Sequence, residues 1–182
     1  MNKVIEIDGK SVGLCANALT PRIYRHKVGR DIVRDLQKLQ TAATSEDGSF
    51  SVSDLEIFED VAFIMARQYD GSIPDNVDEW LEQFEMFSIY KVLPAILELW
   101  SLNNKTTAVP KKKIKQTVRE PTGSTFMLRC AELGLSDEAL EDMTCGMVYD
   151  LMIEKANDAE QYAIKGRPGG LRDFFAGGGK IG

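Results

Sequence analysis

The only histidine of the chain, His26, lies in a basic run at the start of a predicted helix, TPRIYRHKVGRDIVRDLQKLQ (residues 20–40). Together with Cys15 and nearby carboxylates it supplies the groups of a nucleophile–base–acid triad. No GxSxG or Cys–His signature surrounds either residue, and a single histidine in a charged segment is typical of a protein surface. We therefore interpret the run as a binding surface. Its basic residues are Arg22, Arg25, Lys27, Arg30, Arg34 and Lys38.

The other groups with possible chemical roles lack the spacing that their chemistry requires. Glu79, Glu82 and Glu85 follow one face of a predicted helix, as solvated carboxylates do. The terminal GGGKIG has neither the preceding strand nor the following helix of a phosphate-binding loop. No set of potential ligands has the spacing of a metal site. The sequence therefore predicts no enzyme, no cofactor and no metal.

Composition and charge narrow the class of protein further. The 182 residues carry a formal net charge of −6, with a pI near 4.9, so the average surface repels phosphate. The odd number of scattered cysteines, without a CxxC pair, indicates free thiols in a reducing compartment. No signal peptide is evident, and no apolar run approaches the ~20 residues of a membrane span. We expect a soluble protein of the cytosolic type. The cysteines are Cys15, Cys130 and Cys145.

Hydrophobic periodicity predicts a mainly α-helical fold that begins with a short β-hairpin. Ile5 and Ile7 alternate with polar residues, Asp8-Gly9 supplies a two-residue turn, and the alternation resumes at Val12. An isolated hairpin is marginally stable in water, so we expect it to pack on other elements or on a partner.

About four helical segments follow the hairpin in a predicted N-terminal domain, residues 1–102. Ser53 and Glu56 match a capping box at the start of the second segment. Pro94 lies too deep in the fourth segment to be a first-turn proline, so we expect a kink or a restart there. The predicted helical segments cover about residues 28–44, 53–69, 80–87 and 89–102.

The composition changes abruptly after this domain. Residues 103–123 are polar, basic and bounded by proline, which predicts an interdomain linker. Residues 124–165 read as a small helical module, in which Gly134 ends one helix and Thr144 begins another. Residues 166–182 contain seven glycines, which predicts a flexible tail.

Charge is unevenly distributed along the chain. Between Thr41 and Leu99 there are thirteen acidic residues against two basic ones, whereas residues 20–38 and 111–119 are basic. Opposed patches of this kind favour association with a charged protein partner or self-association. The alternative is a small nucleic-acid-associated protein that uses the two basic stretches. The run from Lys111 lacks interleaved aromatic residues for base stacking, which favours a solvated linker there.

Several segments resemble the tail assembly chaperones of long-tailed phages that infect Gram-positive hosts. They are the hairpin IEIDGKSV, the segment PRIYRHKVGRDIVRDLQKL, the helix VLPAILELWSLNNKT and the C-terminal GLSDEALEDMTCGMVYDLMIEK. The resemblance covers essentially the whole chain and corresponds to the long, two-module form. The acidic-aromatic motif near the end, here Arg172–Asp173–Phe174–Phe175, departs from the usual ending of the family because it is followed by a glycine-rich finish.

The resemblance implies a protein that binds and solubilises the tape-measure protein, recruits tail-tube subunits and is absent from the mature virion. It implies action in the host cytoplasm, with possible self-association and no membrane. In many relatives the long form arises by ribosomal frameshifting, and Lys111–Lys113 lies where a slippery sequence would leave its trace. The candidate partner-binding residues are Arg22, Tyr24, Arg25, Arg30, Phe84, Phe87, Trp100, Leu171, Phe174 and Phe175.

Overall fold

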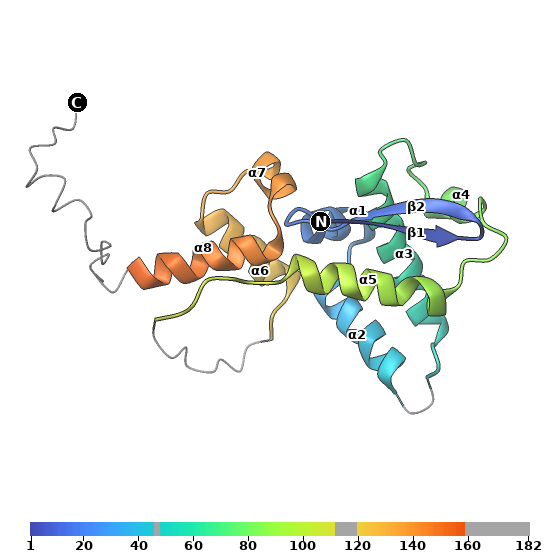
Figure 1. Ribbon diagram of the computed structural model, residues 1–182, viewed down its shortest axis with the longest axis horizontal. Helices are drawn as coiled ribbons and strands as arrows, with labels where there is room; N and C mark the ends of the chain where they lie inside the picture. Colours follow the sequence, from blue (N-terminus) through green and yellow to red (C-terminus); the bar gives the residue numbers. More distant parts are fainter. Residues whose placement is uncertain (46–47, 112–119, 159–182) are drawn as a thin grey trace, which may run out of the picture.

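The computed structural model describes residues 1–45, 48–111 and 120–158, and this part contains eight helices and one β-hairpin. The hairpin and helices α2–α5 lie at one end of the molecule, and α6–α8 lie at the other (Figure 1). The prediction of a mainly helical fold with an N-terminal hairpin is confirmed.

The hairpin forms as the sequence predicts. Strands β1 (Asn2–Ile7) and β2 (Lys10–Cys15) are antiparallel, with Ile5 opposite Val12. Asp8 and Gly9 both have positive φ, 51° and 73°, as a two-residue turn of this hand requires. Strand β2 packs on α3 and strand β1 on α5, so the hairpin covers the helical core and buries its apolar face there.

The basic run forms two helices where one helix over residues 28–44 was predicted. Helix α1 covers Thr20–Val28 and ends at Gly29, which has a φ of 78° that a side chain would disfavour. Helix α2 covers Ile32–Thr44 and begins after Asp31, whose carboxylate accepts hydrogen bonds from the Val33 and Arg34 amides. The predicted start was wrong because the glycine stop and the aspartate cap outweigh the continuous hydrophobic period.

Helix α3 (Val52–Tyr69) is the central, largely buried helix. It begins with a capping box, but the pair is Ser51 with Asp54 and not the predicted Ser53 with Glu56. The Ser51 amide and hydroxyl both donate to Asp54, at 2.9 and 2.6 Å. These hydrogen bonds, with the hydroxyl contact as the larger cause, lower the pKa of Asp54.

The predicted helix over residues 80–87 is also wrong. Helix α4 covers only Val77–Leu81, and the chain then runs without regular structure to α5 (Ile89–Asn103). The helical spacing of the aromatic residues in this stretch comes from side chains that fill one cluster, not from a continuous helix. Helix α5 passes through Pro94 as a single element, so the helix does not restart there.

The C-terminal helices are α6 (Gly123–Glu132), α7 (Asp137–Asp142) and α8 (Cys145–Asp158). Thr122 caps α6 in a reciprocal pair with Thr125, so the helix begins one residue before the predicted start of the C-terminal module at residue 124. Gly134, with φ of 70°, follows the end of α6, and Thr144 accepts from the Met147 amide at the start of α8, both as predicted.

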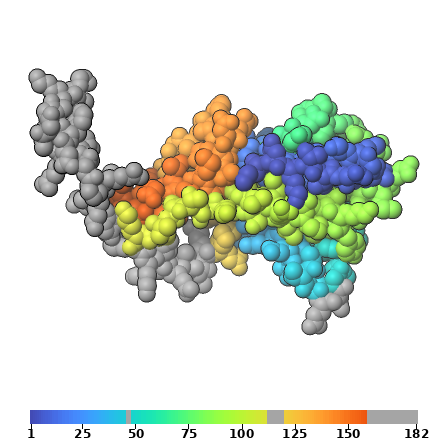
Figure 2. Space-filling view, viewed as in Figure 1, coloured from blue at the N-terminus to red at the C-terminus, as the bar shows by residue number. Residues whose placement is uncertain are grey.

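The C-terminal helices share their hydrophobic core with the N-terminal part of the chain. Ala18 and Leu19, between the hairpin and α1, are buried in the same cluster as Phe126, Leu140 and Val148. The Ala18 amide also donates to the carbonyl of Met143 at 2.8 Å. The space-filling view shows the surfaces of the two parts in contact (Figure 2).

The first part of the predicted linker lies against α8. The carboxylate of Asp150 accepts hydrogen bonds from the amides of Thr107 and Ala108, at 2.8 and 2.9 Å. These bonds, chiefly that from Ala108, lower the pKa of Asp150. Two turns further along α8, the side chain of Asn157 accepts from the Lys111 amide and donates to the carbonyl of Val109. Residues 104–111 are therefore held along the surface of α8.

Gly146 allows this close approach. Replacing it with alanine should therefore destabilise the protein, although alanine ordinarily stabilises a helix. A Cβ atom at position 146 would lie 1.9 Å from the carbonyl oxygen of Lys105. Helix propensity alone favours Gly146→Ala by about 1 kcal/mol. We expect instead that the steric conflict lowers the free energy of unfolding by about 1–3 kcal/mol. Urea unfolding measures this loss, and faster hydrogen exchange at the Thr107 and Ala108 amides shows that the segment is displaced.

Gly71→Ala is the matched control. Position 71 has no neighbouring atom within 4 Å of a built Cβ and no positive φ. Equal stability changes in the two variants would contradict the proposed contact between Gly146 and Lys105.

Candidate partner-binding site

Two clefts lie where the N-terminal and C-terminal helices meet, and Asn17 holds these helices together. The side-chain oxygen of Asn17 accepts from the Leu19 and Thr20 amides at the start of α1 and from Gln68 on α3. Its side-chain nitrogen donates to the carbonyl of Glu141 on α7 at 3.1 Å. Its own carbonyl accepts from Asn103 at the end of α5 and from the thiol of Cys145.

The first cleft, called the basic cleft below, lies between α1 and the start of α6. Its volume is about 540 Å³. Helix α1 contributes Pro21, Arg22, Arg25 and His26 to its lining. The rest of the lining is Arg30, Asp31, Gly123, Ser124 and Met127.

The basic side chains of the basic cleft differ in how far they are already paired. Arg22 forms an ion pair with Asp137 of α7 on the exposed surface. Arg30 contacts Asp35 at 2.9 Å and Asp60 at 2.6 Å. The side chains of Arg25 and His26 are exposed and have no hydrogen-bond or ion-pair partner within residues 1–45, 48–111 and 120–158. Three of the predicted contact residues, Arg22, Arg25 and Arg30, thus line one cleft, and Arg25 is the most available of them.

Tyr24 requires a correction, because it is completely buried and offers no surface to a partner. Its hydroxyl donates to Asp35 at 2.5 Å and accepts from Arg30 at 3.2 Å. Burial, together with the Asp35 carboxylate, raises the pKa of Tyr24. Burial opposes the charge of Arg30, but hydrogen bonds to Asp35, Tyr24 and Asp60 raise its pKa. Tyr24 therefore fixes Arg30 in position beneath the basic cleft.

Asp31 joins the two sides of the basic cleft. Its carboxylate caps α2 and also accepts two hydrogen bonds from the Gly123 amide at the start of α6, at 2.9 and 3.0 Å. A carboxylate is stabilised by the N-terminal end of a helix, and here one carboxylate serves two helices. The junction between α2 and α6 is therefore electrostatic as well as steric.

The second cleft, called the apolar cleft below, lies between α2, α5 and α8 and measures about 500 Å³. Its apolar lining consists of Val33, Leu36, Leu97, Trp100, Pro121 and Tyr149. Trp100, predicted from the sequence as a partner-binding residue, is partly buried and packs against both hydrophobic clusters. Ser101 lies beside it on the exposed rim.

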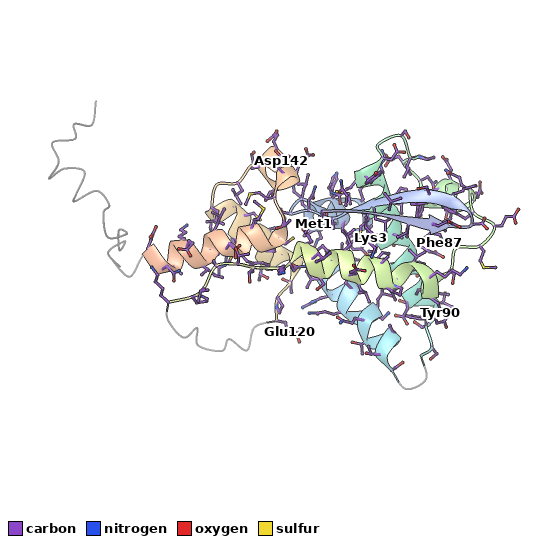
Figure 3. The ribbon with its side chains drawn as sticks, in the orientation of Figure 1. Met1, Lys3, Phe87, Tyr90, Glu120 and Asp142 are labelled. Atoms are coloured by element: carbon purple, nitrogen blue, oxygen red, sulfur yellow. The ribbon has the colours of Figure 1, made fainter. Side chains whose placement is uncertain are left out.

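Phe84 and Phe87, also predicted to contact a partner, lie away from both clefts. They are partly buried and stack on Trp80 with ring centroids 5.3 Å away in each case. Phe87 also contacts Phe58 of α3 at 5.1 Å. The Glu85 amide, between Phe84 and Phe87 in the chain, donates to Asp8 of the hairpin turn at 2.8 Å, and Tyr90 lies in the first turn of α5 (Figure 3). The structure thus gives Phe84 and Phe87 an intramolecular role, that of fixing the irregular stretch after α4.

Leu171, Phe174 and Phe175, the remaining predicted contacts, lie outside the described residues. Within the described ranges, no group of three His, Cys, Asp or Glu side chains could hold a metal ion. In that same part of the chain no helix is long and apolar enough to cross a membrane. Burial raises the pKa of Cys130 to about 11 and that of Cys145 to about 12, so both thiols are protonated at neutral pH.

Sequence reasoning did not identify several residues that build the clefts. Asn17 precedes Thr20 by three positions, a spacing typical of a helix start, but nothing local indicates its contacts with α5, α7 and α8. Nothing in the sequence near Asp31 indicates its hydrogen bond to the Gly123 amide, which joins residues 92 positions apart. Tyr149 gave no signal beyond the apolar period of its helix.

Comparisons with protein families, with curated proteins and with solved structures found no significant match to this chain.

The structural role of Tyr24 gives a stability prediction. Tyr24→Phe removes the hydroxyl that donates to the buried Asp35, so the free energy of unfolding should fall by about 1–3 kcal/mol. The matched control is Tyr90→Phe, because Tyr90 is 69% exposed and its change should stay within about 0.5 kcal/mol. Urea unfolding monitored by circular dichroism measures both. Equal, small losses in the two variants would show that the Tyr24 hydroxyl does not stabilise the network.

Proposed function

We propose that this protein is a phage tail assembly chaperone, which binds and solubilises the tape-measure protein and recruits tail-tube subunits in the host cytoplasm. The resemblance of several sequence segments to that family motivates the proposal. The apolar cleft is the observation that carries it, because a chaperone for a long helical client needs an apolar surface that the client can occupy.

The apolar cleft has the chemistry of a site for an amphipathic helix. Helix-in-groove recognition places apolar anchors of the client in a hydrophobic groove with a polar rim. Leu36, Leu97 and Trp100 form the apolar floor, and Gln37, Gln40 and Ser101 form the exposed rim. Aromatic residues in such clefts often contribute most of the binding energy, which makes Trp100 the leading contact.

The charge of the molecule supports the same function. Glu56 of α3 and Asp78 and Glu79 of α4 are exposed acids. Burial, with the charges of Asp60, Asp78 and Glu56 added to it, raises the pKa of the half-buried Glu59. Net negative charge keeps proteins apart and soluble. When the protein binds an apolar client, its negative charge would help to keep the complex soluble.

Co-expression with the tape-measure and tail-tube genes expected beside this one tests the proposal directly. The tape-measure protein should be insoluble alone and should co-purify as a soluble complex with this chain. If neither phage protein co-purifies, the chaperone function is wrong.

A substitution at the rim of the apolar cleft tests whether the client binds there. Ser101→Arg adds a long charged side chain at the exposed rim, so it should leave the fold intact and weaken client binding at least about tenfold. Ala43→Arg places the same side chain at an exposed position of α2 outside the cleft and should have no effect. Affinity purification at matched expression compares the recovered client. Equal recovery with both variants would exclude the apolar cleft as the binding site.

The alternative of a nucleic-acid-associated phage protein has a distinct result in the same experiment. Residues 112–119 lie outside the described part of the chain, so the structure bears on the first basic stretch only. There, Lys27 pairs with Asp75, and Arg22 pairs with Asp137, which reduces the charge available to phosphates. Nucleic acid co-purifying with the chain, and lost steeply as salt rises, would favour the alternative.

A further inference from the structure

The basic cleft has features of a binding site that the apolar cleft does not share. The side chains of two of its basic residues, Arg25 and His26, have no partner in the described part of the chain, although acids outnumber bases in the protein as a whole. The two clefts have no lining residue in common. A function of the basic cleft therefore does not depend on the chaperone proposal.

The chemistry around the basic cleft matches carboxylates. Asp31 already places a carboxylate on the Gly123 amide, and Asp137 places one on the Arg22 guanidinium. An arginine side chain presents paired N–H donors that fit the two oxygens of a carboxylate. Pro21 and Met127 add an apolar wall beside these donors. A ligand with a carboxylate next to an apolar side chain satisfies both parts of the cleft.

We propose that the basic cleft between α1 and α6 binds an acidic segment of a partner protein, with Arg25 and His26 as its principal contacts. Arg30, held by Tyr24, Asp35 and Asp60, forms the rigid base of the site. Arg22, paired with Asp137 on the exposed surface, borders it.

The two longer segments of this chain outside the described residues, 112–119 and 159–182, are net basic. Residues 112–119 contain four basic residues and no acidic one. Residues 159–182 contain four basic residues against two acidic ones. Neither segment has the net negative charge that complements a cleft lined by arginines, which favours an occupant from another molecule.

A protein segment fits the cleft better than a nucleic acid does. Duplex DNA carries about one charge per 1.7 Å of its axis, a continuous row of phosphates. Asp31 and Asp137 border the cleft and would repel such a row, and the chain carries a net charge of −6. An acidic peptide brings one or two carboxylates among uncharged residues, so it can place them on Arg25 without meeting these acids.

Fluorescence anisotropy with a labelled peptide of alternating Asp and Leu residues tests the proposal on the full-length protein. A peptide with Asn in place of every Asp is the control ligand. Arg25→Glu should weaken binding of the acidic peptide at least about tenfold, because it removes a charge-assisted hydrogen bond. Arg34→Glu makes the same charge change at an exposed, unpaired arginine of the described part that does not line the cleft, and should change affinity less than twofold.

Amide chemical shifts provide a second readout on the unmodified protein. The acidic peptide should shift the Gly123 and Ser124 resonances, which lie in the cleft lining, and should leave those of the hairpin turn unchanged. If the resonances of both the cleft lining and the hairpin turn shift, and Arg25→Glu and Arg34→Glu lose equal affinity for the peptide, the peptide is attracted by diffuse charge. That result would overturn the proposed site.

Four further results would also overturn the proposal. The acidic peptide could fail to bind, or the Asn peptide could bind equally well. A short DNA duplex that displaces the acidic peptide at lower concentration than unlabelled peptide would assign the cleft to nucleic acid. A dimer seen by sedimentation without peptide, and abolished by Arg25→Glu, would assign the cleft to a second copy of the chain.

Discussion

The arrangement of the whole molecule depends on the burial of one polar side chain, Asn17. An amide buried without partners is costly, so Asn17 must find hydrogen bonds wherever the fold places it. Its side chain finds them on α1, α3 and α7, and its backbone carbonyl accepts from the end of α5 and from the first residue of α8; the residue is only 8% exposed. Five helices are therefore tied to one residue between the hairpin and α1. A shift of the C-terminal helices would leave several of these groups buried and unpaired.

The clefts follow from this junction. The basic cleft needs α6 beside α1, which Asp31 secures by capping α2 and accepting from the Gly123 amide at the same time. The apolar cleft needs α8 beside α2 and α5, and residues 104–111 hold α8 there through Asp150. Trp100 packs against both hydrophobic clusters and also lines the apolar cleft. A ligand in either cleft would thus contact both parts of the chain.

Local signals in the sequence predict some parts of this structure well. The Asp8-Gly9 turn, the stop at Gly134 and the cap at Thr144 all depend on neighbouring residues, and all are confirmed. The predicted helix boundaries were wrong where the spacing of apolar residues suggested a helix but local capping or tertiary packing did not allow one. Gly29 and Asp31 divide a segment whose apolar spacing suggests one continuous helix. Phe84 and Phe87 have helical spacing in the sequence, but they lie in an irregular segment and pack in one aromatic cluster.

The candidate sites were less predictable because their residues meet only in the folded chain. The sequence indicates Arg22, Arg25 and Trp100 through charge and aromatic character, but not the surfaces opposite them. Gly123 joins Asp31 across 92 positions, and Tyr149 reaches the cleft of Trp100 from another helix. Tyr24 looked like a contact residue because it lies among arginines, yet its burial makes it a support for Arg30.

The central claim is that docking through Asn17 makes the two parts of the chain one cooperative unit and thereby forms both clefts. Native-state hydrogen exchange of the full-length protein and of Asn17→Ala tests it most directly, because it reports the opening free energy of each helix separately. We predict that in the unaltered chain the amides of α3 and α8 exchange with the same free energy, and that Asn17→Ala lowers the value for α8 by about 1–3 kcal/mol or more. A helix α8 that exchanges independently of α3 in the unaltered chain, and is unaffected by Asn17→Ala, would contradict the claim.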